Sequence, residues 1–373
     1  FSAKLLQRGF GRGKFQQFYS LSIETVGTAV SEFTELNPDQ RREAINTQQR
    51  YAGLAEAQRR RDAYRGSMVW GRSKGRDYLL RSVYDKHGRR RQTSLGLRGP
   101  ETERIKAEFD QGRGEARARW DSMRAVMDRQ AAINRVLGLG RVPMIGARII
   151  RSLDACGLLG GAIRVLGTNA LYAYEAAAGV RIESGLTATE DIDLLFDSRA
   201  RLQFVATGEG EGEAVSLLRV LQQVDSSFER SREPFRARNR DGYIVDLIKP
   251  LRSPPWRSDP VRLGSDAQDL EAVEIEGLAW HESAPAFEAI AIDERGEPLR
   301  IVASDPRVFA IHKHWLSQRL DREPIKKPRD LQQACVVAAL VVGWLPHLSL
   351  DGDDLRMLPK AVVDDALPLF RAP

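Results

Sequence analysis

Cysteine is scarce in this chain of 373 residues, which contains only Cys156 and Cys335. The two lie far apart and each sits in an apolar run, so we predict two reduced, buried thiols and no disulfide framework. Long apolar runs are also missing, because the longest, residues 334–345, falls short of the roughly 20 residues that a membrane-spanning helix needs. These absences argue against a disulfide scaffold and a membrane anchor, and we expect a cytoplasmic protein.

Motifs of several common enzyme classes are absent as well. The sequence has no Cys-X-X-Cys pair, no Ser/His/Asp motif and no Walker-type glycine loop. His312 and His314 suggest zinc by composition, but side chains two positions apart on a helix diverge by about 200°, so we predict no zinc site there. The chemistry has to be sought among the carboxylates.

Charge is distributed unevenly along the chain, and the formal net charge of +6 conceals this. Residues 1–150 contain 30 Lys and Arg against 16 Asp and Glu, a balance of +14, whereas residues 151–373 contain 27 against 35, a balance of −8. A cationic segment joined to an acidic body is typical of a polyanion-binding arm, since basic clusters release counterions when they meet phosphates. An arginine-rich, solvated helix surface is the alternative.

The length and the pattern of the chain predict several parts. A chain of this size suffices for two or three compact units, each with its own core. We predict an α+β protein with a basic N-terminal region of helix and β-meander over residues 1–100 and a helical connector over residues 101–157. A core with a mixed β-sheet flanked by helices follows over residues 158–303, and a helical C-terminal region over residues 304–373.

Basic and aromatic residues are interleaved in the predicted meander. Trp70, Tyr78 and Tyr84 lie among many cations. Aromatic side chains can stack on bases while arginines hold phosphates, so this pattern favours RNA, and tRNA in particular, as a partner. The cations that we single out as candidate nucleic-acid-binding residues are Arg72, Lys74, Arg76, Arg89, Arg90 and Arg91.

A junction between a short apolar strand and a helix stands at Gly167, Thr168 and Asn169. A glycine at such a junction lets a phosphate approach the backbone, the free amide groups of the first helical turn point toward it, and Thr168 adds a hydroxyl. Strand-to-helix junctions of this kind are common. Taken alone, this one is weak evidence for a phosphate-binding site.

Two carboxylates two positions apart, Asp191 and Asp193, begin an apolar run that we predict to be a strand. Residues at this spacing project from the same face of a strand, so the two acids stand side by side. Because neighbouring carboxylates repel each other, both stay ionised only when a cation joins them, and their oxygens suit Mg²⁺ or Mn²⁺. A charged strand end exposed to water is the alternative for the pair alone.

A third acid, Asp246, lies inside an otherwise apolar run on a predicted hairpin that turns at residues 239–242. A carboxylate buried alone is costly, so it requires a partner or a metal. If its strand lies beside the strand with Asp191 and Asp193, the three acids converge. Three carboxylates around two Mg²⁺ ions are typical of in-line attack on an α-phosphate.

In this order, Gly167-Thr168, Asp191-X-Asp193 and Asp246 resemble the three-part pattern of the polymerase-beta-like nucleotidyltransferase superfamily. The long gap before Asp191 and the run of residues 189–193 look more like the bacterial branch that includes the AbiEii abortive-infection toxins. The resemblance covers about residues 160–335. Many members have a serine or a second glycine where this chain has Thr168 and Asn169, but a hydroxyl is preserved.

The resemblance implies roles for particular residues. Gly167, Thr168 and Asn169 would bind the triphosphate. Asp191 and Asp193 would bind both metals, and Asp246 the metal that activates the acceptor. Lys313, on a helix side away from the apolar positions, would meet nucleotide phosphates. Asp330 matches a downstream family aspartate, although an acid in a first helical turn is also explained by the helix dipole.

We therefore expect a Mg²⁺-dependent enzyme that moves a nucleoside monophosphate from an NTP, such as ATP, to an acceptor hydroxyl. The basic meander favours RNA or tRNA as acceptor, a protein hydroxyl is second and a cationic small molecule third. One alternative is a toxin with the same chemistry and an antitoxin partner. Another is a non-catalytic nucleic-acid-binding protein on the same fold.

Overall fold

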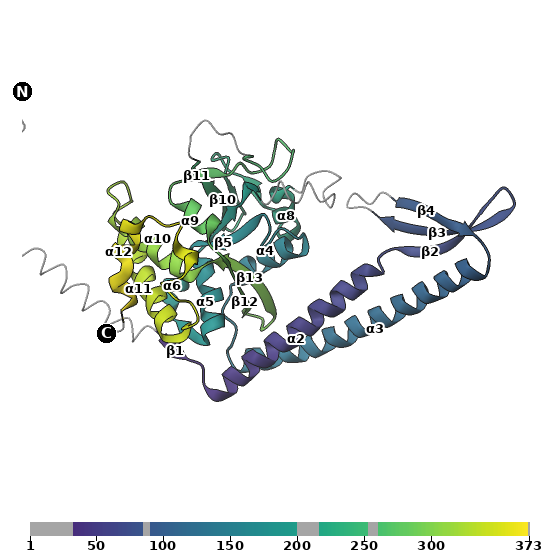
Figure 1. Cartoon of the computed structure of the whole chain (residues 1–373), viewed down its shortest axis with the longest axis horizontal. Coiled ribbons are helices and arrows are strands. Elements are labelled where there is room, and N and C mark those ends of the chain that lie inside the picture. The colour runs from purple at the N-terminus through teal and green to yellow at the C-terminus, as the bar shows by residue number, and fades with distance from the viewer. Residues whose placement is uncertain (1–32, 85–89, 200–215, 253–259, 372–373) are drawn as a thin grey trace, which may run out of the picture. The chain divides into compact units, whose positions relative to one another are not determined.

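The computed structural model describes residues 33–84, 90–199, 216–252 and 260–371 (Figure 1). It divides into two compact units. Residues up to 36, 145–291 and 300–373 belong to the first unit, and residues 37–144 and 292–299 to the second. The predicted α+β class is confirmed: a mixed eight-stranded sheet with helices, an N-terminal helix with a β-meander, and a helical C-terminal region.

The second unit consists of a long helical pair and a three-stranded meander. Helices α2 (Pro38–Ala63) and α3 (Pro100–Val136) lie side by side, and the meander joins the end of α2 to the start of α3 (Figure 1). Its antiparallel strands are β2 (Ser67–Ser73), β3 (Arg76–Tyr84) and β4 (Arg90–Leu97). Asn37 begins α2, because its side chain accepts a hydrogen bond from the Gln40 amide while Gln40 returns one, a capping box.

A buried polar network holds the second unit together. The Thr47 hydroxyl of α2 donates to the side-chain oxygen of Asn134 on α3 over 3.0 Å, and Gln130 donates to the same oxygen over 2.9 Å. Asn134 in turn donates to the Gly296 carbonyl over 2.8 Å. The network therefore ties both helices to the 292–299 segment.

The first unit is built on the eight-stranded sheet. Its order is β12-β13-β5-β7-β10-β9-β8, and β11 pairs with β10. The strands are β5 (Ile163–Leu166), β7 (Asp191–Phe196), β8 (Glu229–Arg230), β9 (Arg236–Arg238), β10 (Ile244–Pro250), β11 (Val273–Ile275), β12 (Ala286–Ile292) and β13 (Pro298–Ser304). β10 runs parallel to β7, whereas β5 runs antiparallel to β7 and β9 antiparallel to β10, which makes the sheet mixed.

Helices accompany the sheet along the first unit, and a short strand pair, β1 (Phe33–Glu35) with β6 (Val180–Ile182), lies outside it. The helices are α4 (Met144–Ala155), the 3-10 turn η2 (Gly167–Ala170), α5 (Leu171–Ala178), α6 (Ser184–Thr187), α8 (Leu217–Val224), α9 (Leu278–Ser283), α10 (Pro306–Gln318), α11 (Lys327–Trp344) and α12 (Lys360–Ala366), with 3-10 turns η3 (Asp353–Leu355) and η4 (Leu367–Phe370). Helices α10, α11 and α12 gather together (Figure 1).

The apolar segments of the chain lie within the units and include both cysteines or their neighbours. In the described ranges, no helix is both long and apolar enough to cross a membrane. Cys335 is buried on α11 as predicted, but Cys156 is only half-buried, because it follows the last residue of α4. Neither cysteine forms a disulfide.

Candidate active site

Asp191, Asp193 and Asp246 lie on one face of the central sheet. β7 and β10 are parallel neighbours, and in their register Asp246 stands directly beside Asp193. Because alternate residues of a strand share a face, Asp191 projects from the same side. Ile192, which points to the other face, is completely buried. The condition that the sequence left open, adjacency of the two strands, is therefore met.

Gly167 lies against the Asp193 carboxylate. β5 pairs antiparallel with β7, which places Leu166 opposite Asp193 and Gly167 just beyond. The φ angle of Gly167 is +60°, in the left-handed region, and a Cβ there would lie 2.0 Å from Oδ2 of Asp193. The left-handed conformation favours glycine, and a larger residue would require the Asp193 carboxylate to move. The Asp193 carboxylate occupies the place that a side chain at position 167 would take.

The two residues after Gly167 form hydrogen bonds with β7 and α11. The Asn169 side chain donates to the Asp191 carbonyl over 2.7 Å, which fixes the start of β7. The Thr168 hydroxyl accepts a hydrogen bond from Gln333 of α11 over 3.2 Å. Of the three residues at this junction, Gly167 lies against the Asp193 carboxylate, Asn169 contacts the Asp191 backbone and Thr168 contacts α11.

Negative charge is incompletely balanced around Asp193. Burial, followed by the charges of Asp191 and Asp246, raises the pKa of Asp193 to about 6, while Lys313 and Arg322 act in the opposite direction. An ionised carboxylate with two like-charged neighbours is stabilised by a cation. Oxygen donors on one sheet face are the ligands that Mg²⁺ prefers, so Asp191 and Asp193 fit a divalent ion.

Asp246 has a partner that the sequence did not reveal. Arg236, its register neighbour on β9, donates two hydrogen bonds of 2.7 Å to the two carboxylate oxygens. Over the described ranges, no group of three or more acidic, histidine or cysteine side chains is already arranged around a metal position. Asp246 is therefore paired with an arginine of the chain, and the Thr189 hydroxyl donates a hydrogen bond to Asp191.

Lys313 belongs to a second ion cluster between α10 and α11. Its Nζ lies 2.7 Å from Oδ1 of Asp330, and the Nε of Arg322 lies 2.7 Å from Oδ2. Although burial opposes them, Lys313 and Arg322 lower the pKa of Asp330. Asp330 stands in the first turn of α11, as the dipole explanation requires, but two cations hold it. Arg322 was missed by the sequence because only the packing of the helices places it there.

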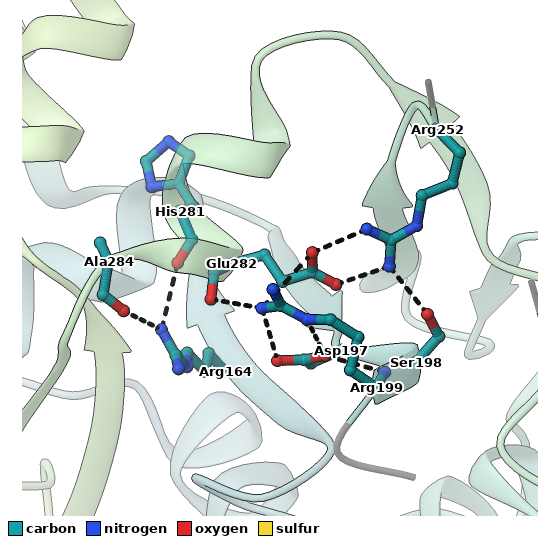
Figure 2. Close-up of polar contacts among 8 residues, drawn as sticks. All are labelled: Arg164, Asp197, Ser198, Arg199, Arg252, His281, Glu282 and Ala284. Carbon is teal, nitrogen blue, oxygen red and sulfur yellow. Dashed lines mark hydrogen bonds and ion pairs between the residues drawn. The ribbon is translucent and has the colours of Figure 1, made fainter. Parts of the chain in front are cut away.

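The opposite end of β7 carries another cluster of acids and arginines (Figure 2). Arg252 donates to both carboxylate oxygens of the buried Glu282, each over 2.9 Å, and to the Ser198 hydroxyl over 2.9 Å. Arg199 donates to both oxygens of Asp197 over 3.2 and 3.3 Å and lies 3.4 Å from Glu282. The acids of this cluster are matched by cations of the chain itself.

The candidate nucleic-acid-binding residues lie in the second unit. Arg72, Lys74 and Arg76 are exposed at the β2–β3 turn, and Arg90 and Arg91 are exposed on β4. The Arg90 guanidinium donates to the Ser82 hydroxyl over 3.0 and 3.1 Å. Arg89 falls outside the described residues.

Comparison with known proteins adds one match. A family model described as Nucleotidyltransferase matches residues 145–358, more than half of the chain. This span contains both ion clusters and the three acids on β7 and β10. No curated protein and no solved structure matches the chain.

Proposed function

The chain belongs to the nucleotidyltransferase family, and from this membership we propose that it transfers a nucleoside monophosphate from an NTP to an acceptor hydroxyl with a divalent cation, Mg²⁺ or Mn²⁺. The observation that supports this most directly is the sheet face on which Asp191 and Asp193 stand beside Asp246, next to Gly167. The raised pKa of Asp193 adds an electrostatic reason for a cation at this place.

In the proposed reaction, the acceptor oxygen forms a bond to the α-phosphorus and the bond from that phosphorus to its bridging oxygen breaks. Pyrophosphate leaves with the bonding electrons, and the hydroxyl proton passes to water. A divalent cation held by Asp191 and Asp193, when bound, lowers the pKa of the attacking hydroxyl and offsets the charge on pyrophosphate. The chain itself supplies Thr168 as a hydroxyl donor to the NTP phosphates, and Lys313 with Arg322 as cations within electrostatic reach of Asp193.

For the acceptor, we favour RNA, with tRNA as the specific candidate. The exposed cations of the meander, together with Tyr84, a residue that is 64% exposed, combine phosphate binding with a ring on which a base can stack. The AbiEii-like features of the sequence make a toxin with an antitoxin partner the specific alternative. Expression of wild type and of an Asp191→Ala/Asp193→Ala variant, with growth as the readout, separates a toxin from a housekeeping enzyme.

Incubation with each α-³²P-labelled NTP, Mg²⁺ and either total RNA or a lysate tests the transfer itself. We expect label on RNA with wild type and at least about 100-fold less with Asp193→Asn, since even an outer partner of a metal ligand is worth 10–100-fold. Label on a protein would keep the transferase and change the acceptor. Equal label with both proteins would contradict the proposed function.

A further inference from the structure

A basic cavity of about 560 Å³ adjoins the site at the outer edge of the sheet. Residues of β8, β9 and the turn between them line it, including four arginines against two acids. The charged lining residues are Glu229, Arg230, Arg232, Glu233, Arg236 and Arg238. The lining thus carries a net positive charge directly beside a carboxylate site.

Strand register connects this cavity to the three acids. Asp193, Asp246 and Arg236 form one row across β7, β10 and β9. Arg238, two residues after Arg236, projects from the same face and stands one row along. The carboxylates therefore end where the arginines begin, on a single face of the sheet.

The arginines that line the cavity differ in whether they contact other groups of the chain. Arg236 is bound to Asp246, and Arg230 donates to the Asp269 carbonyl over 3.3 Å. Within the part of the chain that the structure describes, the guanidinium groups of Arg232 and Arg238 have no hydrogen bond or ion pair, and both residues are exposed. Two unpaired guanidinium groups can accept an anion without breaking a contact of the fold.

The side of the sheet on which the cavity lies indicates which substrate it meets. Gly167 and Thr168, to which we assign the NTP phosphates, follow β5 on one side of β7, whereas the cavity lies beyond β10 on the other side. The cavity is therefore on the acceptor side of the carboxylates. A guanidinium binds phosphate through two parallel hydrogen bonds, and a row of arginines repels a cationic acceptor.

We propose that this cavity binds a backbone phosphate of a single-stranded RNA acceptor through Arg232 and Arg238, and so positions the terminal hydroxyl beside Asp246. The inference rests on the proposed function and specifies its acceptor. A nucleic acid brings phosphates at regular spacing next to its hydroxyl, whereas an unmodified protein hydroxyl or an aminoglycoside brings none.

Charge reversal at the two unpaired arginines tests the assignment. Arg232→Glu/Arg238→Glu is compared with Arg219→Glu/Lys360→Glu, which changes the net charge equally at exposed positions of α8 and α12. The probe is a fluorescently labelled single-stranded RNA of about ten nucleotides, titrated at several salt concentrations. We expect the cavity variant to bind the RNA at least about tenfold more weakly than wild type, and the slope of log affinity against log salt concentration to be smaller by about two. The affinity of the control variant should change less than about twofold.

Steady-state kinetics distinguish RNA phosphates from NTP phosphates. The cavity variant should raise the KM for RNA about tenfold and leave the KM for the NTP unchanged. Arg232→Gln/Arg238→Gln, which removes charge without reversing it, should give a smaller change in the same direction. A raised KM for the NTP, an equal effect of the control variant, or unchanged RNA binding would each overturn the assignment.

The two proposals fail in different ways. If wild type labels a protein instead of RNA and the cavity variant is as active as wild type, the cavity assignment is wrong and the transferase stands. If RNA binds through Arg232 and Arg238 but no NMP is transferred to anything, the proposed function and the acceptor role of the RNA are wrong, and only the phosphate-binding role of the two arginines stands.

Discussion

The acids at the two ends of β7 differ in their partners. At the beginning, Asp191 and Asp193 stand together, and burial with like charges raises the pKa of Asp193 to about 6. After the end, Asp197 is paired with Arg199, and Glu282 with Arg252 in a bidentate contact (Figure 2). Arginines of the chain contact the acids at the end of β7 directly, although burial, which Arg252 opposes, still raises the pKa of Glu282. The acids at the beginning of β7 are balanced only in part, which suits a cation from solution.

Substitution at the beginning of β7 should have the largest effect, a loss of transfer activity. Asp193→Asn should reduce NMP transfer at least about 100-fold, because the cation loses a ligand. The same change should leave the metal-free protein as stable as wild type or more stable, because it removes a charge that like charges and burial oppose. Transfer assays and urea titrations of both proteins measure the two effects. A destabilised Asp193→Asn protein would contradict this part of the comparison.

Substitution at the other end should produce the reverse pattern. Glu282→Ala removes a carboxylate that is 1% exposed and leaves Arg252 without its bidentate partner. We expect a loss of about 3 kcal/mol in the free energy of unfolding, since breaking a buried pair leaves an uncompensated charge. The kcat of the protein that remains folded should be close to that of wild type. A large fall in kcat with normal stability would place Glu282 in the chemistry instead.

The contact of Gly167 with Asp193 can be separated from the strain of its backbone. Gly167 and Gly179 have similar φ angles, +60° and +66°, but an added Cβ meets the Asp193 carboxylate only at Gly167 and open space at Gly179. Each substitution by alanine should cost about 1–2 kcal/mol of stability from the left-handed conformation. Only Gly167→Ala should also lower transfer activity, by about tenfold or more. Equal activity of the two variants would show that the close approach has no role in the reaction.

The raised pKa of Asp193 also predicts a dependence of stability on pH. A carboxyl whose pKa is raised in the folded state binds its proton more tightly there than in the unfolded chain. Its contribution therefore favours folding at low pH and is lost as the pH rises from about 4 through about 6. Without metal, the melting temperatures of wild type and Asp193→Asn should agree near pH 4 and diverge above pH 6, with the variant higher. A constant difference across this range would contradict the raised pKa.

The sequence predicted those features of the site that depend on local periodicity. The spacing of Asp191 and Asp193 places them on one strand face, and the turn at residues 239–242 places Asp246 on the second strand of a hairpin. The register that sets Arg236 opposite Asp246 depends on the type of turn, because a turn shifted by one residue would pair other residues.

The remaining contacts depend on tertiary structure. Lys313, Arg322 and Asp330 meet because α10 and α11 pack together, and no periodicity within one helix predicts that. Part of the cation excess of the first 150 residues is exposed on the meander. The basic cavity, in contrast, lies in the second part of the chain, whose net charge is negative and therefore gave no indication of it. The charge of the cavity depends on the positions of a few arginines and not on the net charge of that part of the chain.

Direct measurement of cation binding tests the central claim. Mn²⁺ titrations followed by electron paramagnetic resonance, with a non-hydrolysable NTP analogue present, compare wild type with Asp193→Asn and Glu282→Gln. Each substitution exchanges a carboxylate for an amide, one at each end of the comparison. We predict that Glu282→Gln binds Mn²⁺ as wild type does and that Asp193→Asn binds it at least about tenfold more weakly. Equal binding by all three proteins would contradict the assignment of the Asp191 and Asp193 face as the cation site.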